Sequence, residues 1–277
     1  MKIYEERRLK LTENLSGDIA VIIPGSVLAN RSNDIAYPFR QDSNFYYLSG
    51  FNEPDSTLMI INKSGKTNSI GFVPKKDKLK EIWDGFRYGP EGMKSDFGFN
   101  DAFNSDEIDE LLPDLLDGVS CVYYPFGKVE GFDQKVIKWT KKANSKDRHS
   151  KKMEIADISK IIGNKRLIKD SSEINIIEKA CKISANAHLE AMKFVKPGMN
   201  EAEVEAFYLY EFAKNGGRFP AYNPIVASGE NACVLHYAQN NQVINDGDLL
   251  LVDAGCEYEM YASDITRTFP ANGKFSD

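Results

Sequence analysis

The sequence is poor in the residues that build disulfide frameworks and soft-metal sites. Its 277 residues include three histidines and four cysteines, and no two cysteines stand in a C-x-x-C spacing. Such isolated cysteines indicate buried reduced thiols, and they argue against a disulfide-stapled fold or a cysteine zinc site. The cysteines are Cys121, Cys181, Cys233 and Cys256.

Long apolar runs are also missing. No stretch approaches the ~20 apolar residues of a membrane helix, and the first ten residues alternate charged with apolar side chains rather than forming a signal-peptide core. We therefore expect a cytoplasmic protein without a membrane partner. Cationic excess is lacking as well: the net charge of -6 argues against a nucleic-acid partner but suits the binding of a hard cation.

The remaining composition, 42% hydrophobic and 27% charged, is typical of a globular protein long enough for two domains. Residues 1–124 alternate apolar strand-like runs with a helical spacing of apolar residues at 106–116, where Pro113 threatens to split the helix. This alternation predicts an α/β domain. The expected strands are residues 18–24, 45–48, 58–62, 69–74 and 120–124.

A polar, basic stretch at 141–152 (KKANSKDRHSKK) indicates a solvated loop or helix end on the approach to a domain boundary. We place the boundary near 163–165, which gives domains 1–164 and 165–277. Asp170 and Glu173 form a capping-box pattern that begins a helix running to about 197, and Asn200 caps a second helix that ends near 216. Strands are expected at 224–228, 248–254 and 261–269.

Two acids in the last segment suggest a metal site. Asp253 ends the apolar run 249–252, and Asp264 follows eleven residues later inside another strand-like run. A hairpin centred between Tyr258 and Glu259 would make the two acids direct cross-strand partners, with Cβ atoms ~5 Å apart. Carboxylates this close repel unless a cation separates them, as in two-metal hydrolases. Two exposed turn acids explain the spacing about equally well.

His236 is the third candidate. It lies in SGENACVLHY, beside an expected strand and near the acids in sequence, and it is a candidate acid, base or substrate ligand. A lone histidine is more often an ordinary core or surface residue, so the residue pattern favours that interpretation. His149 in the basic stretch and His188 on the first helix of the second domain are assigned no role.

Longer stretches of the sequence resemble a known family. The runs NPIVASGENACVLHYAQNN and DGDLLLVDAGCEYEMYASDITRTFPANGKF are similar to the proline-specific aminopeptidases of the pita-bread metallopeptidase superfamily. YPFRQDSNFYYLSGFNEPDSTLMI and EIWDGFRYGPEG resemble the N-terminal domain of bacterial Xaa-Pro aminopeptidases, and RLIKDSSEI resembles the entry to their catalytic domain. The resemblance covers essentially the whole chain.

The resemblance implies an α/β N-terminal domain, a mixed sheet with flanking helices, followed by the first half of an α+β pita-bread (creatinase/aminopeptidase-like) domain. It implies two divalent metal ions, ordinarily Mn²⁺, with Asp264 bridging both ions and Asp253 binding one. His236 would line the substrate site and assist proton transfer. The implied reaction removes the first residue from peptides with proline in second position. Such enzymes often form tetramers or dimers, in which Trp83 and Asp34 match positions that reach a neighbour's substrate; a turn acid remains the simpler interpretation of Asp34.

The chain departs from the family pattern at its end. The family uses five metal ligands, and the later histidine and two glutamates have no counterpart before Asp277. We expect a fragment of a longer protein with little or no peptidase activity by itself. We also expect poor solubility for an isolated 165–277 segment, because half of the fold would leave a sheet uncovered.

Two alternative functions stay open. Within the enzyme class, a prolidase that cleaves Xaa-Pro dipeptides is the nearest rival, although the N-terminal motifs favour the aminopeptidase. In a different class, a pita-bread pseudoenzyme would bind peptides without cleaving them. The presence of Asp253, Asp264 and His236 argues against the pseudoenzyme, because a binding module has no need of paired acids.

Overall fold

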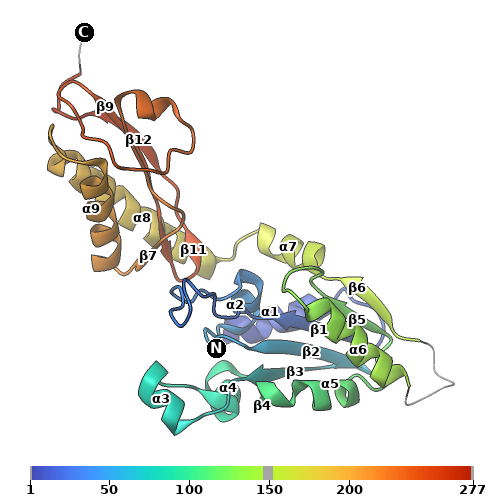
Figure 1. Cartoon of the computed structure of the whole chain (residues 1–277). Helices are drawn as coiled ribbons and strands as arrows, with labels where there is room; N and C mark the ends of the chain where they lie inside the picture. The colour runs from blue at the N-terminus through green and yellow to red at the C-terminus, as the bar shows by residue number, and fades with distance from the viewer. Residues whose placement is uncertain (1, 146–151, 276–277) are drawn as a thin grey trace. The chain divides into compact units, whose positions relative to one another are not determined.

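The computed structural model describes residues 2–145 and 152–275. The chain divides into two compact units, Met1–Ile168 and Lys169–Asp277 (Figure 1). Each unit has its own hydrophobic core, and no described core cluster draws residues from both. The units are therefore described one at a time.

The first unit is built on a six-stranded mixed sheet with the order β4-β3-β2-β1-β5-β6. Neighbours β1–β2 and β2–β3 run antiparallel, whereas β3–β4, β1–β5 and β5–β6 run parallel. This mixed sheet with flanking helices confirms the α/β prediction. The strands are β1 Ile19–Pro24, β2 Thr57–Lys63, β3 Lys66–Val73, β4 Asp101–Asn104, β5 Cys121–Tyr124 and β6 Glu154–Asp157.

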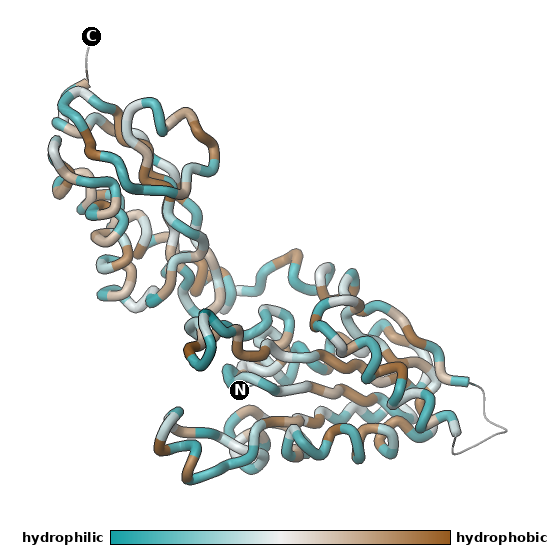
Figure 2. The backbone as a smooth tube through the Cα atoms, viewed as in Figure 1, coloured by the Kyte–Doolittle hydropathy of each residue, from teal (hydrophilic) through white to brown (hydrophobic). Residues whose placement is uncertain are grey.

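Strand β1 is buried on both faces, which explains its unbroken apolar sequence. Ile19, Val21 and Ile23 belong to one core cluster, whereas Ala20 and Ile22 belong to the other, because successive side chains of a strand point to opposite faces. Figure 2 shows hydrophobic residues along the strands in the middle of this unit. Helices α1 Lys2–Thr12, α2 Ser43–Ser49, α4 Gly89–Phe97 and α7 Ser159–Leu167 supply the first cluster, and α5 Ile108–Leu115 and α6 Phe132–Asn144 the second.

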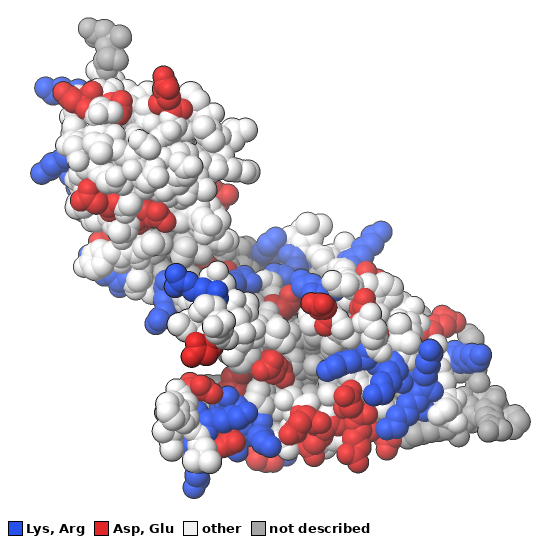
Figure 3. Space-filling model, viewed as in Figure 1, with Lys and Arg blue, Asp and Glu red and all other residues white. Residues whose placement is uncertain are grey.

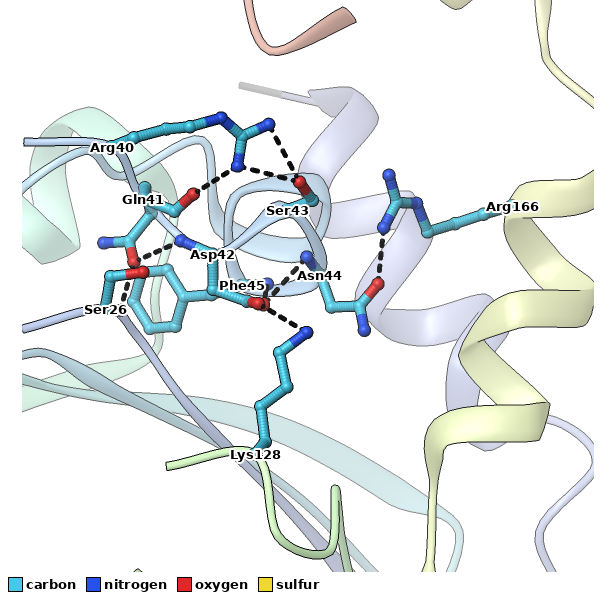
Figure 4. Close-up of polar contacts among 9 residues, drawn as sticks. All are labelled: Ser26, Arg40, Gln41, Asp42, Ser43, Asn44, Phe45, Lys128 and Arg166. Atoms are coloured by element: carbon cyan, nitrogen blue, oxygen red, sulfur yellow. Dashed lines mark hydrogen bonds and ion pairs between the residues drawn. The ribbon is translucent and has the colours of Figure 1, made fainter. Parts of the chain in front are cut away.

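The strand expected at residues 45–48 is wrong, because these residues form helix α2. The side chain of Asp42 accepts hydrogen bonds from the backbone N–H groups of Asn44 and Phe45, both at 2.9 Å, which caps the helix (Figure 4). Lys128 holds the same carboxylate in an ion pair of 3.0 Å. At the other end, Gly50 adopts a left-handed conformation (φ 69) that terminates the helix.

The other expected elements of the first unit are present with adjusted bounds. The helix predicted at 106–116 appears as α5 after a short 3₁₀ turn, Ser105–Glu107, and Pro113 lies within α5 without ending it. The basic stretch 141–152 begins as the last turn of α6, and residues 146–151 lie outside the described residues. The exposed helix α3, Lys78–Asp84, was not anticipated, and neither were α1, α4, α7, β4 and β6.

The second unit packs two helices against two small antiparallel sheets. Helices α8 Ser171–Phe194 and α9 Glu201–Lys214 begin at complete capping boxes, so the predicted starts at Asp170 and Asn200 are confirmed. The sheets have the orders β11-β10-β7 and β12-β9-β8. Their strands are β7 Phe219–Pro220, β8 Ile225–Ser228, β9 Leu249–Asp253, β10 Cys256–Tyr258, β11 Tyr261–Ala262 and β12 Thr266–Pro270.

Charged side chains of both signs are interspersed on the visible face of the first unit (Figure 3). Over the described residues, no helix combines the length and the hydrophobicity that crossing a bilayer requires.

Candidate metal centre

Asp253 and Asp264 lie on one long hairpin, although they are not the direct partners that the sequence suggested. Asp253 ends β9 and pairs with Thr266, while Tyr258 pairs with Tyr261. The hairpin therefore turns at Glu259 and Met260, one residue later than expected. Both turn residues have positive φ values, 46 and 71, which is the geometry of a two-residue hairpin turn.

In the observed register Asp264 lies opposite Gly255 and is a diagonal neighbour of Asp253. The displacement amounts to two residues along a strand, and side chains two residues apart share a face. Both carboxylates thus remain on the same side of the hairpin, within the ~7–8 Å range of diagonal pairs. The expected strand 261–269 is interrupted between β11 and β12, and Asp264 lies in that interruption.

Tyr222 connects the two acids. Its hydroxyl lies 2.5 Å from Oδ1 of Asp253 and 3.1 Å from Oδ1 of Asp264. The hydroxyl has one proton, and both carboxylates accept a hydrogen bond from it. Burial raises the pKa of Tyr222 well above its ordinary value, and the neighbouring carboxylates raise it further. The phenol therefore stays protonated and supplies the donor that two adjacent carboxylates need when no cation lies between them.

His236 shares a cavity with both acids. The cavity has a volume of about 410 Å³, and it is lined by Tyr222, Asn223, Ile225, His236, Tyr237, Ala238, Asp253 and Asp264. His236 is exposed on the loop that follows β8, whereas Asp253 is half-buried at the end of its strand. The structure thus brings together the three residues that the sequence singled out in the second unit.

The oxygen donors of this cavity fit part of a divalent metal site. Two carboxylates on one face of a rigid hairpin suit a hard cation such as Mn²⁺ or Mg²⁺ better than a soft one. Among the described residues, however, no three His, Cys, Asp or Glu side chains gather closely enough to hold an ion. Asp253 and Asp264 thus offer two carboxylates, which are fewer donors than a divalent cation takes.

Family models match both units. The model described as aminopeptidase P, N-terminal domain, matches residues 4–123, and the model of metallopeptidase family M24 matches residues 175–277. The chain thus combines a segment that matches the aminopeptidase P N-terminal domain with a segment that matches metallopeptidase family M24. The order of the two matched domains is the one that the sequence resemblance implied.

Relatives with known names are similar to this chain over nearly its whole length. It is 39% identical to a Xaa-Pro aminopeptidase of Haemophilus influenzae, over 99% of this chain and 61% of the relative. It is 36% identical to human Xaa-Pro aminopeptidase 3, over 94% of this chain and 52% of the relative. A zinc-substituted Escherichia coli aminopeptidase P in complex with product superposes with a TM-score of 0.96 at 38% identity, covering 99% of this chain and 63% of that one. The chain thus spans less than two thirds of these proteins.

Trp83 and Asp34, the remaining predicted site residues, belong to the first unit. Trp83 lies on α3 with 86% of its surface exposed, beside the exposed apolar side chains of Leu79 and Ile82. Asp34 is exposed in the loop between β1 and α2. Neither residue lines the cavity of Asp253 and Asp264. His149, to which no role was assigned, lies outside the described residues.

Sequence reasoning missed two residues that shape the site. Tyr222 follows β7 in the stretch FPAYNP, where nothing in the local pattern distinguishes it from a packing tyrosine. Glu201 looks like an ordinary acid in the first turn of a helix, yet it is fully buried. Each is recognisable only when segments far apart in the sequence are seen side by side.

Proposed function

We propose that this chain is part of a metal-dependent aminopeptidase that hydrolyses the N-terminal Xaa-Pro bond of peptides. The observation that carries the proposal is the convergence of Asp253, Asp264 and His236 on one cavity. The names of the relatives support the substrate class, because they are Xaa-Pro aminopeptidases from bacteria to mammals. We infer a domain boundary at 164/165.

The proposed metal centre holds two divalent ions, with Mn²⁺ as the expected metal. Asp253 and Asp264 would help to hold these ions, and further ligands would come from outside residues 1–277. When bound, the metals would polarise the scissile carbonyl and lower the pKa of a bound water. Tyr222 would continue to donate a hydrogen bond to Asp253, keeping that carboxylate oriented toward the cavity.

His236 would act on the peptide from another part of the cavity lining. Its ring is exposed on a loop of the same cavity, so an imidazole nitrogen can donate a proton to the peptide or accept one from it. Trp83 and Asp34 are proposed as peptide contacts in a neighbouring copy of a homo-oligomer. The support for Trp83 is its 86% exposure, which is unusual for a side chain of this size. We infer action in the cytoplasm.

The test assays the product of the complete reading frame on an Xaa-Pro-containing tripeptide with added Mn²⁺. Asp264→Asn should lower metal-dependent release of the first residue by at least about 100-fold, since even an outer partner of a metal ligand is worth ~10–100-fold. Glu259→Gln is the matched control, because Glu259 is an exposed acid on the turn of the same hairpin.

Three other results would redirect the proposal. Absence of release from any peptide by the folded protein with Mn²⁺ supplied would favour the peptide-binding pseudoenzyme. Release from Xaa-Pro dipeptides but not from tripeptides would favour a prolidase. Equal losses in Asp264→Asn and Glu259→Gln would refute the assignment of Asp264 to the metal centre.

A further inference from the structure

The segment that carries His236 has little regular structure of its own. We call residues 229–242 the His236 loop; it starts with a 3₁₀ turn, Gly229–Cys233, and reaches Gln242 without another helix or strand. Three consecutive residues of this loop, His236, Tyr237 and Ala238, line the cavity of the two acids. A loop of this kind needs external contacts to hold one conformation, because its backbone makes few ladder hydrogen bonds.

Those contacts converge on one carboxylate. Glu201, the first residue of α9, has no exposed surface, and it accepts hydrogen bonds from both ends and from the middle of the loop region. Its Oε1 accepts from the Ser228 N–H at 2.8 Å, the Ser228 hydroxyl at 2.7 Å and the Asn231 amide at 3.2 Å. Its Oε2 accepts from the Tyr237 hydroxyl at 2.8 Å and the Gln242 N–H at 3.0 Å.

Only a carboxylate satisfies this arrangement. All five groups that face Glu201 are donors, and a carboxylate offers about four lone pairs and no proton. A glutamine would direct an NH₂ group at some of these donors. Burial by itself would raise the pKa of Glu201, but the hydrogen bonds from Ser228, Gln242 and Tyr237 outweigh it, and the pKa lies below the ordinary value of 4.5. The side chain is therefore ionised at neutral pH.

Besides Glu201, a second residue of α9 anchors the loop: Glu205, one helical turn further along. Asn240, which is 4% exposed, donates through Nδ2 to Glu205 at 2.9 Å and to the Pro224 carbonyl at 2.8 Å, and its Oδ1 accepts from the Val226 N–H at 3.0 Å. Asn240 ties the loop to the beginning of β8, however, and none of its partners adjoins His236. Of the two anchors, Glu201 alone contacts the immediate neighbour of His236, through the Tyr237 hydroxyl.

We propose that Glu201 is a positioning residue for His236: its buried carboxylate clamps the His236 loop so that the imidazole is held at the metal cavity. The inference rests on the proposed peptidase function for its catalytic consequence, but the clamp itself is a property of the described chain. Glu201 does not touch the cavity, so it acts through the loop, above all through Tyr237.

The first experiment needs no activity. Three histidines give three sets of imidazole signals in an NMR spectrum of the chain, and His236→Ala identifies the signals of His236. Glu201→Gln should shift and broaden the His236 signals and leave those of buried His188 in place. Glu203→Gln, an exposed glutamate in the same turn of α9 whose capping role glutamine retains, should change neither. Unchanged His236 signals in a folded Glu201→Gln chain would overturn the proposal.

The second experiment is a double-mutant cycle on the product of the complete reading frame. Glu201→Gln should lower kcat by about 10- to 100-fold with little change in KM, the loss expected when a catalytic group is misplaced by ~1 Å. In a His236→Ala background the same change should cost less than about twofold, because its target is gone. Multiplicative losses would show that Glu201 supports the fold in general and would overturn the proposal.

The outcomes also separate this proposal from the proposed function. If the complete protein releases no residue from any peptide, the peptidase proposal fails, whereas the NMR comparison still decides whether Glu201 holds the loop. If Glu201→Gln does not fold, Tyr237→Phe replaces it in both experiments. That variant removes one of the five donors and leaves Oε2 bonded to Gln242. It should give a smaller change of the same sign, and no change at all would overturn the proposal.

Discussion

At the scale of single residues, the second unit contains polar groups whose states are set by burial. His188 on α8 is 3% exposed, and its two ring nitrogens have different partners. Nε2 lies 3.1 Å from the Ala254 carbonyl and must carry the proton, because a carbonyl only accepts. Nδ1 accepts from the Tyr208 hydroxyl at 2.9 Å. This neutral histidine supports the backbone of Ala254, the residue directly after the end of β9.

His188 predicts a pH dependence of stability. Burial lowers the pKa of His188 below the ordinary 6.5, so His188 binds a proton more readily in the unfolded chain than in the folded chain. The contribution of neutral His188 to the free energy of unfolding is present above pH 6.5. It is lost as the pH falls from there through the lower folded pKa, by up to about 1.4 kcal/mol per pH unit. The free energy of unfolding should therefore fall more steeply between pH 7.5 and 5.5 in the natural chain than in His188→Gln. Parallel pH profiles from urea unfolding would contradict this.

Tyr222 gives a second prediction at this scale. Tyr222→Phe removes the donor that two adjacent carboxylates share, and the metal-free chain should lose about 1 kcal/mol of unfolding free energy. Affinity for Mn²⁺ in the complete protein should fall ~10-fold, since the hydroxyl orients Asp253. Isothermal titration calorimetry checks the affinity, with Tyr210→Phe, an exposed tyrosine on α9, as the control. Equal Mn²⁺ affinity in Tyr222→Phe and Tyr210→Phe would show that the Tyr222 hydroxyl does not support metal binding.

At the scale of elements, the hairpin holds its two acids together through a close approach of its strands. Gly255 lies opposite Asp264, and a Cβ atom there would overlap the carbonyl oxygen of Ser263. Across the interruption, backbone hydrogen bonds run from Ser263 to Cys256 and from Ala254 to Ile265, and the Cys256 N–H donates to the hydroxyls of Ser184 and Ser263 at 2.9 and 3.1 Å. The spacing of the acids therefore depends on a missing side chain at residue 255 and on serine hydroxyls, one of which comes from α8.

This close approach makes Gly255→Ala a sharp test. The added methyl must push the strands apart between Asp253 and Asp264, and we expect a loss of about 1–3 kcal/mol of stability together with weaker metal binding. Gly163→Ala on α7 is the control: a Cβ there meets nothing within 4 Å, and alanine should stabilise the helix by ~0.5–1 kcal/mol. Chemical denaturation measures both. A neutral Gly255→Ala would mean that the hairpin is looser than described.

At the scale of the whole molecule, the two units are independent in their cores. Val136 on α6 belongs to a cluster of the first unit and Val204 on α9 to a cluster of the second, and neither has exposed surface. Val136→Ala and Val204→Ala should each cost about 2 kcal/mol, and each should destabilise its own unit alone. Hydrogen exchange resolved by residue would show this. Loss of protection in both units from either variant would mean that they unfold together.

The sequence anticipated the parts of the fold that depend on local patterns. The apolar run of β1 and the capping boxes of Asp170 and Asn200 act within a few residues, and their elements are confirmed. The error at residues 45–48 is also local: Asp42 and Gly50 are helix-capping residues, but the aromatic run between them favoured a strand. The hairpin register was missed because Glu259 and Met260 carry no Asn-Gly signal for the turn that they form.

The sequence by itself indicated Asp253, Asp264 and His236 as candidates, because carboxylates after a buried strand and a histidine beside another are visible as residue types. It also determined that Asp253 and Asp264 share a face, since a register change of two residues preserves the alternation of side chains. Only the tertiary structure decided the rest. The roles of Tyr222, Glu201 and Gly255 arise from contacts with residues distant in the chain or across the hairpin, and such contacts leave no mark on local composition or periodicity.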